Sequence, residues 1–158
     1  NHEATSSAID EDGWLHTGDL GTIDSEGYLF IKGRSKNMIL GPSGQNIYPE
    51  EIEDRLNALP YVSESLVIEN DPGTLLGRLR MAAAPKEKHG KLIALVYPDY
   101  EVVKKEKISP EQLKTKMDEN RKLLNHMLPM YSQVARLKIQ ETEFEKTPKR
   151  SIKRYLYQ

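Results

Sequence analysis

The sequence predicts an α+β fold: about three strands in a mixed sheet, packed by two to three helices and preceded by a short β-hairpin. Two β-rich apolar runs, at residues 62–69 and 91–97, should pair as strands. Two other segments have apolar residues at helical spacing, and each begins with a proline in its first turn. The first third of the chain is instead divided by glycine-containing turn clusters, which are typical of hairpins.

The hairpin is expected from residues 20–23 and 28–32, which flank the turn Asp24-Ser25-Glu26-Gly27. A second tight loop, Gly41-Pro42-Ser43-Gly44, lies between short apolar segments. A third strand is expected at residues 134–139 and a short helical end at residues 155–158.

The first helix should begin at Pro49, with acidic residues facing the positive end of its dipole, and end before Pro60. The second should begin after Ser109, which suits an N-cap, and end before Pro129. The predicted core residues of the two helices are Ile52, Leu56, Leu59, Leu113, Met117, Leu124 and Leu128.

The composition argues against several kinds of binding site and against a membrane span. The 158 residues carry a net charge of −1, which gives no general attraction to nucleic acid, and no specific nucleic-acid partner is expected. There is no cysteine and the four histidines are dispersed, so no metal site is expected. No apolar run approaches the roughly 18 residues of a membrane span, which favours a cytoplasmic location.

The start at Asn1, without an initiator Met, suggests a piece of a longer polypeptide. Residues 70–90 suggest a surface insertion with no fixed role.

Asp19 and Arg34 each follow a glycine, and together they would offer a carboxylate and a guanidinium to a nucleotide ribose. Each residue alone has a plainer explanation. Asp19 could bond its own backbone in a turn, and Arg34 could be a solvated surface charge. Trp14 and Tyr28 are interpreted as packing residues and His16 as a structural residue.

Three motifs nevertheless occur in order. They are Gly13-Trp14-x-His16-Thr17-Gly18-Asp19-Leu20, then Gly27-Tyr28-x-x-x-Lys32-Gly33-Arg34-x-Lys36-x-x-Ile39, then Gly44-Gln45-Asn46-Ile47-Tyr48-Pro49-x-Glu51-Ile52-Glu53. Together they resemble the adenylate-forming (AMP-binding) superfamily, and most closely its long-chain fatty acyl-CoA ligases. The resemblance implies a ligase that activates a fatty acid as acyl-AMP and transfers it to coenzyme A.

The resemblance also implies a division of the chain. Residues 1–33 would be the terminal β segment of a large N-terminal domain, residues 34–36 the hinge, and residues 37–158 a mobile C-terminal domain. Because the phosphate loop, adenine pocket and acyl tunnel of such enzymes belong mostly to the N-terminal domain, this chain alone is expected to be inactive.

The resemblance also implies roles for individual residues of these three motifs. Asp19 and Arg34 would bind the ribose, Lys36 would be the hinge residue, and the loop with Gly44, Gln45 and Asn46 would line the thiol channel. The implied ligands are fatty acid, ATP or AMP, coenzyme A and Mg²⁺, the last bound mainly by the N-terminal domain. That domain is itself an implied partner, and peripheral association with a membrane stays open.

The family also uses a lysine after the turn that contains Pro148, where it would stabilise charge during adenylation. A preorganised cationic donor of this kind is worth roughly 10²–10³ in rate. Alignment from Thr147 places Ser151 at that position. Lys153 fits if the turn is two residues longer and is the leading candidate, whereas Lys149 fits if the turn is two residues shorter.

Two alternatives remain beside the fatty-acid ligase. Ser151 could mark a lost active site in a non-catalytic binding module of the same ancestry, whose basic tail binds phosphate, RNA or a carrier protein. The chain could also come from an amino-acid adenylation domain that delivers to a carrier protein.

Overall fold

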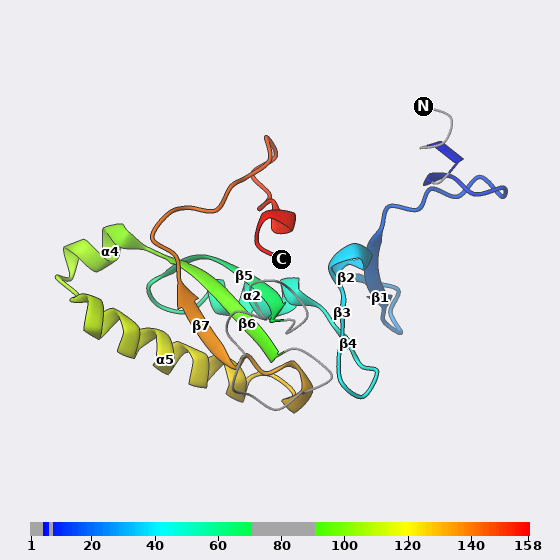
Figure 1. Ribbon diagram of the computed structural model, residues 1–158. Helices are drawn as coiled ribbons and strands as arrows, with labels where there is room; N and C mark the ends of the chain where they lie inside the picture. The colour runs from blue at the N-terminus through cyan, green and yellow to red at the C-terminus, as the bar shows by residue number, and fades with distance from the viewer. Residues whose placement is uncertain (1–4, 7, 71–90) are drawn as a thin grey trace, which may run out of the picture.

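The computed structural model describes residues 5, 6, 8–70 and 91–158, so the insertion expected at residues 70–90 lies almost wholly outside the described residues (Figure 1). The α+β prediction is confirmed: a three-stranded mixed sheet carries helices and is preceded by a β-hairpin. The strands are β1 (Asp19–Ile23), β2 (Leu29–Arg34), β3 (Ile39–Leu40), β4 (Asn46–Ile47), β5 (Val62–Asn70), β6 (Lys91–Pro98) and β7 (Arg136–Ile139). The α-helices are α2 (Pro49–Asn57), α4 (Tyr100–Lys105) and α5 (Pro110–His126), and the 3-10 helices are η1 (Ser35–Asn37), η2 (Met130–Ser132) and η3 (Arg154–Leu156).

The first hairpin forms as predicted, with β1 and β2 antiparallel. Its turn is closed by the Asp24 carboxylate, which accepts hydrogen bonds from the backbone N–H groups of Glu26 and Tyr28, each at 2.9 Å. β3 and β4 form a second, much shorter antiparallel pair around the predicted loop. The two turn clusters therefore each produce a hairpin.

The main sheet has the order β5-β6-β7, with β5 antiparallel and β7 parallel to β6. β7 begins at Arg136, two residues later than the predicted start at residue 134. The reason is Asn125, whose side chain accepts from the Val134 N–H at 2.8 Å and donates to the Val134 carbonyl at 2.9 Å. The backbone of Val134 is thus bonded to a side chain of α5 rather than to a strand.

Both long predicted helices are present. Proline at the first position and Glu50 and Glu51 in the first turn begin α2, whose residues Ile52 and Leu56 are buried. Ser109 caps α5 in a capping box with Gln112. The third helix, α4, was not predicted: the Asp99 side chain caps it by accepting from the N–H groups of Glu101 and Val102.

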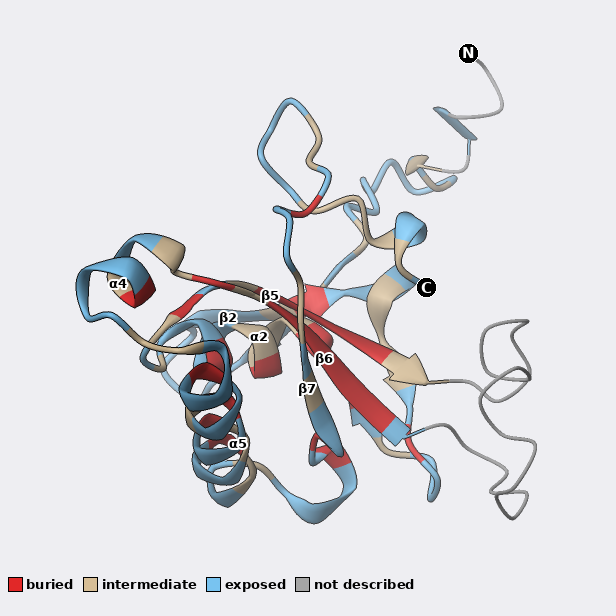
Figure 2. Cartoon of the chain, turned by 60° about the vertical axis from the view of Figure 1, so that its left-hand side comes forward, coloured by how far each residue is buried: buried red, intermediate tan, exposed pale blue. Residues whose placement is uncertain are grey.

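Strands β5 and β6 are buried on both faces, which explains why they are almost continuously apolar, whereas β7 is partly exposed (Figure 2). On one face, Val67, Ala94 and Val96 pack with buried residues of α2 and α5. The opposite face packs against the segment after β7, where Phe144 is 3% exposed and stacks edge-on with Tyr157, with ring centroids 5.2 Å apart. The C-terminal segment is therefore part of the core.

Among the described residues, every helix is too short or too polar to cross a lipid bilayer.

Candidate functional site

Asp19 and Arg34 face each other across the first hairpin as Cα partners, and Arg34 Nε lies 2.9 Å from Asp19 Oδ1. The guanidinium also donates from one terminal nitrogen to the Thr17 carbonyl at 2.8 Å. Gly18 makes the preceding bend with φ +76°, a conformation that glycine adopts without strain. Two strands and one glycine turn thus hold the two side chains together.

This pair remains open to a ligand, with the Asp19 side chain 35% and the Arg34 side chain 58% exposed. Within the described part of the chain, the second carboxylate oxygen of Asp19 has no hydrogen-bond partner. It offers a charged acceptor beside a multi-donor cation, the combination that suits neighbouring hydroxyl groups. The pair therefore presents a charged acceptor and a multi-donor cation to solvent side by side.

Lys36 follows in η1, fully on the surface, and no described residue pairs with it. The segment around it is held from both ends. Ser35 donates its N–H to the Gly18 carbonyl at 2.9 Å, and the Asn37 side chain donates to Glu50 Oε1 at 2.5 Å. Lys36 is thus a free cation on a short segment between two anchors.

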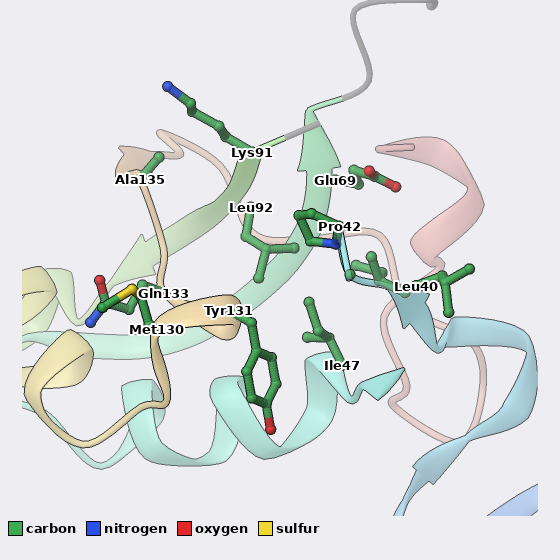
Figure 3. A pocket seen from close by; sticks show the side chains of 12 residues that line it. Leu40, Pro42, Ile47, Glu69, Lys91, Leu92, Met130, Tyr131, Gln133 and Ala135 are labelled. Atoms are coloured by element: carbon green, nitrogen blue, oxygen red, sulfur yellow. The ribbon is translucent and has the colours of Figure 1, made fainter. Parts of the chain in front are cut away.

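The loop with Gly44, Gln45 and Asn46 joins β3 to β4. Gly41 donates its N–H to the Gln45 carbonyl at 2.7 Å, and Gly44 turns the chain with φ +82°. Beside this loop lies a pocket of about 300 Å³ (Figure 3). Leu40 and Pro42 line one side of it, and Met130 and Tyr131 of η2 line another.

The C-terminal turn is defined by backbone hydrogen bonds of 2.8 Å, from Arg150 N–H to the Thr147 carbonyl and from Thr147 N–H to the Ser151 carbonyl. Arg150 has φ +62°, an uncommon conformation for a side-chain-bearing residue. Lys149 is exposed at the tip. Lys153 lies beyond the turn, half-buried, with Nζ 3.6 Å from a Glu145 carboxylate oxygen.

The structure therefore joins Asp19 to Arg34, with Lys36 next in the chain. Among the described residues, no hydrogen bond or ion pair links Lys149 or Lys153 to this pair, and the loop at Gly44 contributes none either. The predicted site residues thus form three separate groups in this arrangement of the chain.

One cluster was missed by the sequence analysis. Arg154 donates from both terminal nitrogens to Glu53 Oε1, at 2.8 and 2.7 Å, and the same oxygen accepts the Val67 N–H at 2.6 Å. Burial raises the pKa of Glu53 to about 7, although Arg154 and the Val67 N–H both favour the ionised form. No local pattern could have revealed it, because Arg154 and Glu53 are 101 positions apart.

Sequence comparison finds ligases that match part of the chain, and no family model matches it. The long-chain-fatty-acid–CoA ligase FadD13 of Mycobacterium tuberculosis is 44% identical over 94 residues, which are 60% of this chain and 16% of that protein. The long-chain-fatty-acid–CoA ligase ACSBG1 of Macaca fascicularis is 42% identical over 78 residues, 49% of this chain and 11% of that protein. The matched stretch is thus a small part of either ligase.

Comparison with solved structures covers nearly the whole chain. ATP-bound MatB from Rhodopseudomonas palustris is 26% identical with a TM-score of 0.62, over 98% of this chain and 26% of that chain. The adenylation domain of a carboxylate reductase from Mycobacterium chelonae shares the fold, with a TM-score of 0.74 at 20% identity, over 98% of this chain and 23% of that chain. The chain is therefore similar in sequence to part of two long-chain fatty-acid–CoA ligases and in fold to part of MatB and of a carboxylate reductase adenylation domain, and it spans about a quarter or less of each of these proteins.

Proposed function

We propose that this chain is the C-terminal part of an AMP-forming ligase that joins a long-chain fatty acid to coenzyme A. In that reaction a carboxylate oxygen attacks the α-phosphorus of ATP, and pyrophosphate leaves as acyl-AMP forms. The thiol sulfur of coenzyme A then attacks the acyl carbon, loses its proton and displaces AMP. The observation that carries the proposal is the Asp19–Arg34 pair, at 2.9 Å and open to solvent, within a sequence and fold related to such enzymes.

In this proposal Asp19 accepts hydrogen bonds from the ribose hydroxyls and Arg34 donates to the same sugar. Bonds to charged groups contribute on the order of 1.5–3 kcal/mol each. Lys36 is the hinge residue of the exposed segment 34–36, in which Ser35 is bonded to Gly18 and which Asn37, bonded to Glu50, follows. The loop at Gly44 then lines the path of the thiol, and the pocket beside it supplies apolar surface.

The candidate cation is Lys153, with Lys149 as the alternative. Ser151 and Lys153 are the two neighbours of Ile152, which pairs with Lys146 in an isolated β-bridge. We propose that the long Lys153 side chain supplies the charge that Ser151 lacks. Lys149, at the exposed tip, is free to approach an anionic group from the other side of the turn.

Residues 1–33 are proposed to complete a large N-terminal domain that lies outside this chain. Apolar side chains on the first hairpin support this, because Ile23, Leu29 and Ile31 are each more than 60% exposed. A two-stranded hairpin has no core of its own and requires a surface on which to pack. Mg²⁺ is proposed to bind mainly in that N-terminal domain. The described residues of this chain contain no group of three or more His, Cys, Asp or Glu side chains that could hold a metal ion.

A non-catalytic binding module is the second candidate function, and Ser151 at the position of the expected lysine is the observation that favours it. An amino-acid adenylation domain stays a third alternative, and the two long-chain fatty-acid–CoA ligases described above do not favour it.

The test is a chimera in which this chain replaces the matching C-terminal part of FadD13. With ATP, palmitate and coenzyme A, the chimera should form palmitoyl-CoA, whereas the 158-residue chain alone should form none. If the chimera with Asp19→Asn folds properly but loses activity, this would support Asp19 as the ribose-binding residue. Turnover by the isolated chain would contradict the division proposed here.

A further inference from the structure

We infer that Arg154 is a positioning residue that ties the C-terminal turn to the segment 34–36 through Glu53 and Glu50. The term hinge for that segment rests on the proposed function, whereas the tie itself rests on contacts within this chain.

The first part of the tie is the Arg154–Glu53 pair. The side chains of both residues are only 13% exposed, and both terminal nitrogens of Arg154 lie within 2.8 Å of Glu53 Oε1. Water cannot easily replace either partner at this burial. Removal of one partner would leave the other charge uncompensated, so the pair holds its geometry firmly even where it adds little net stability.

The second part is Glu50, one helical turn before Glu53 on α2. Its Oε1 lies 3.7 Å from the Arg154 guanidinium and accepts the hydrogen bond from Asn37. Its other oxygen packs against Gly33, where an added Cβ would lie only 2.6 Å away. One carboxylate therefore contacts Gly33 and Asn37, the two residues that enclose the segment 34–36.

The third part is the connection from Arg154 to the turn. Lys153 donates its N–H to the Glu145 carbonyl at 2.8 Å, and Ile152 forms the bridge to Lys146 that closes the segment carrying the turn. Arg154 is the next residue. A shift of this segment therefore moves the guanidinium, and with it the carboxylate that holds Asn37.

The charged groups around the cluster are consistent with a positioning role. Asp54 faces solvent on the same helix, and Lys32 of β2 pairs with Glu51 at 2.8 Å. Lys32 is thus committed to another carboxylate of α2, and Arg154 is the one described cation bonded to Glu50 and Glu53.

The experiment measures amide hydrogen exchange in the 158-residue chain with Arg154→Met. The reporters are the amides of Ser35 and Met38, which are bonded to the carbonyls of Gly18 and Arg34. They should exchange about tenfold faster, the size expected for coupled sites. The amides of β6 should keep their protection. The same substitution at Arg121, which breaks an exposed ion pair with Asp118, is the matched control and should leave Ser35 and Met38 unchanged.

Thermodynamic coupling is reciprocal, so a perturbation at the other end gives a second test. Asn37→Leu should speed exchange at the Lys153 and Leu156 amides by about the same factor. Arg154→Lys, which keeps the charge, should restore part of the protection at Ser35 and Met38.

If the folded Arg154→Met chain shows unchanged exchange at Ser35 and Met38, the proposed connection is refuted. It is also refuted if the β6 amides lose protection to the same extent, because that would indicate general destabilisation. Should Arg154→Met fail to fold, Asn37→Leu decides: faster exchange in the tail supports the tie, and unchanged exchange refutes it. Because no nucleotide or substrate is present, these outcomes are independent of the ligase proposal, which the chimera tests separately.

Discussion

Arg34 and Asp19 are Cα partners in the register of β1 and β2, and their side chains form an ion pair with 2.9 Å between Nε and Oδ1. Their distance is fixed by the register of β1 and β2 rather than by a loop. An exposed ion pair contributes little to stability, so its role is better sought in binding. The Asp19–Arg34 pair presents one charged acceptor and several donors on one surface.

Asp19→Asn should weaken AMP binding by about tenfold in the ligase chimera, because a neutral amide oxygen replaces a charged acceptor. Isothermal titration with AMP measures the effect. Glu26→Gln, an exposed carboxylate in the turn of the same hairpin, is the control and should bind AMP like the unsubstituted protein. Equal affinity in both variants would remove Asp19 from the site.

Lys153→Met should lower pyrophosphate release in the chimera by roughly 10²-fold, and Lys149→Met should leave it within a few-fold. Release is followed with a coupled phosphate assay at saturating ATP and palmitate. If Lys149→Met lowers the rate and Lys153→Met does not, the cation is Lys149 at the tip of the turn.

Ser151→Lys complements these substitutions. If Lys153 supplies the cation, a lysine at position 151 should change the rate little in the otherwise unsubstituted chimera and should partly restore it in the Lys153→Met background. Activity that is insensitive to both Lys149→Met and Lys153→Met would favour the binding-module alternative.

Glu53→Gln should flatten the dependence of stability on pH. The pKa of Glu53 is about 7 in the folded chain against an ordinary value of 4.5, so folding favours the protonated form. The resulting contribution to the free energy of unfolding is fully present below pH 4.5 and is lost as the pH rises through 7. A pKa shift of this size corresponds to roughly 3 kcal/mol of stability. Urea unfolding at several pH values measures it. Glu119→Gln, an exposed carboxylate on α5, should retain the slope of the unsubstituted chain.

Gly33→Ala should destabilise the chain by about 1–3 kcal/mol, because its Cβ would displace the Glu50 carboxylate from Asn37. Thermal unfolding of the single variants and of Gly33→Ala combined with Glu50→Ala provides the measurement. The combined cost should be clearly less than the sum, since removal of the Glu50 carboxylate makes room for the methyl group. Strictly additive effects would mean that the glycine serves another purpose.

The regular elements were predictable because their signals are local. Pro49 and the Ser109–Gln112 capping box set the starts of α2 and α5, and burial on both faces explains the continuous apolar run of β6. Helix α4 was missed because Val102 and Val103 disfavour helix, and only the Asp99 cap signals its start. Six residues give too short a pattern to detect.

In the candidate site, the sequence predicted closeness only for residues that belong to neighbouring motifs. Asp19 and Arg34 meet as expected, whereas Arg154, Glu50 and Glu53 come together through tertiary packing. Trp14 and Tyr28, interpreted as packing residues, are 73% and 63% exposed in this chain. Their aromatic character was visible in the sequence, but the surface that would cover them was not.

The parallel pairing of β7 with β6 has a kinetic consequence. Ile93 lies beside Arg136, and the chain between them includes both α4 and α5. Contacts between residues so distant in sequence form late, because the closure entropy of the connection must be overcome first. We therefore expect β7, and the C-terminal segment that follows it over the sheet, to be the last part of the chain to acquire protection during refolding. The turn with Lys149 and Lys153 would then be assembled only after the rest of the sheet is complete.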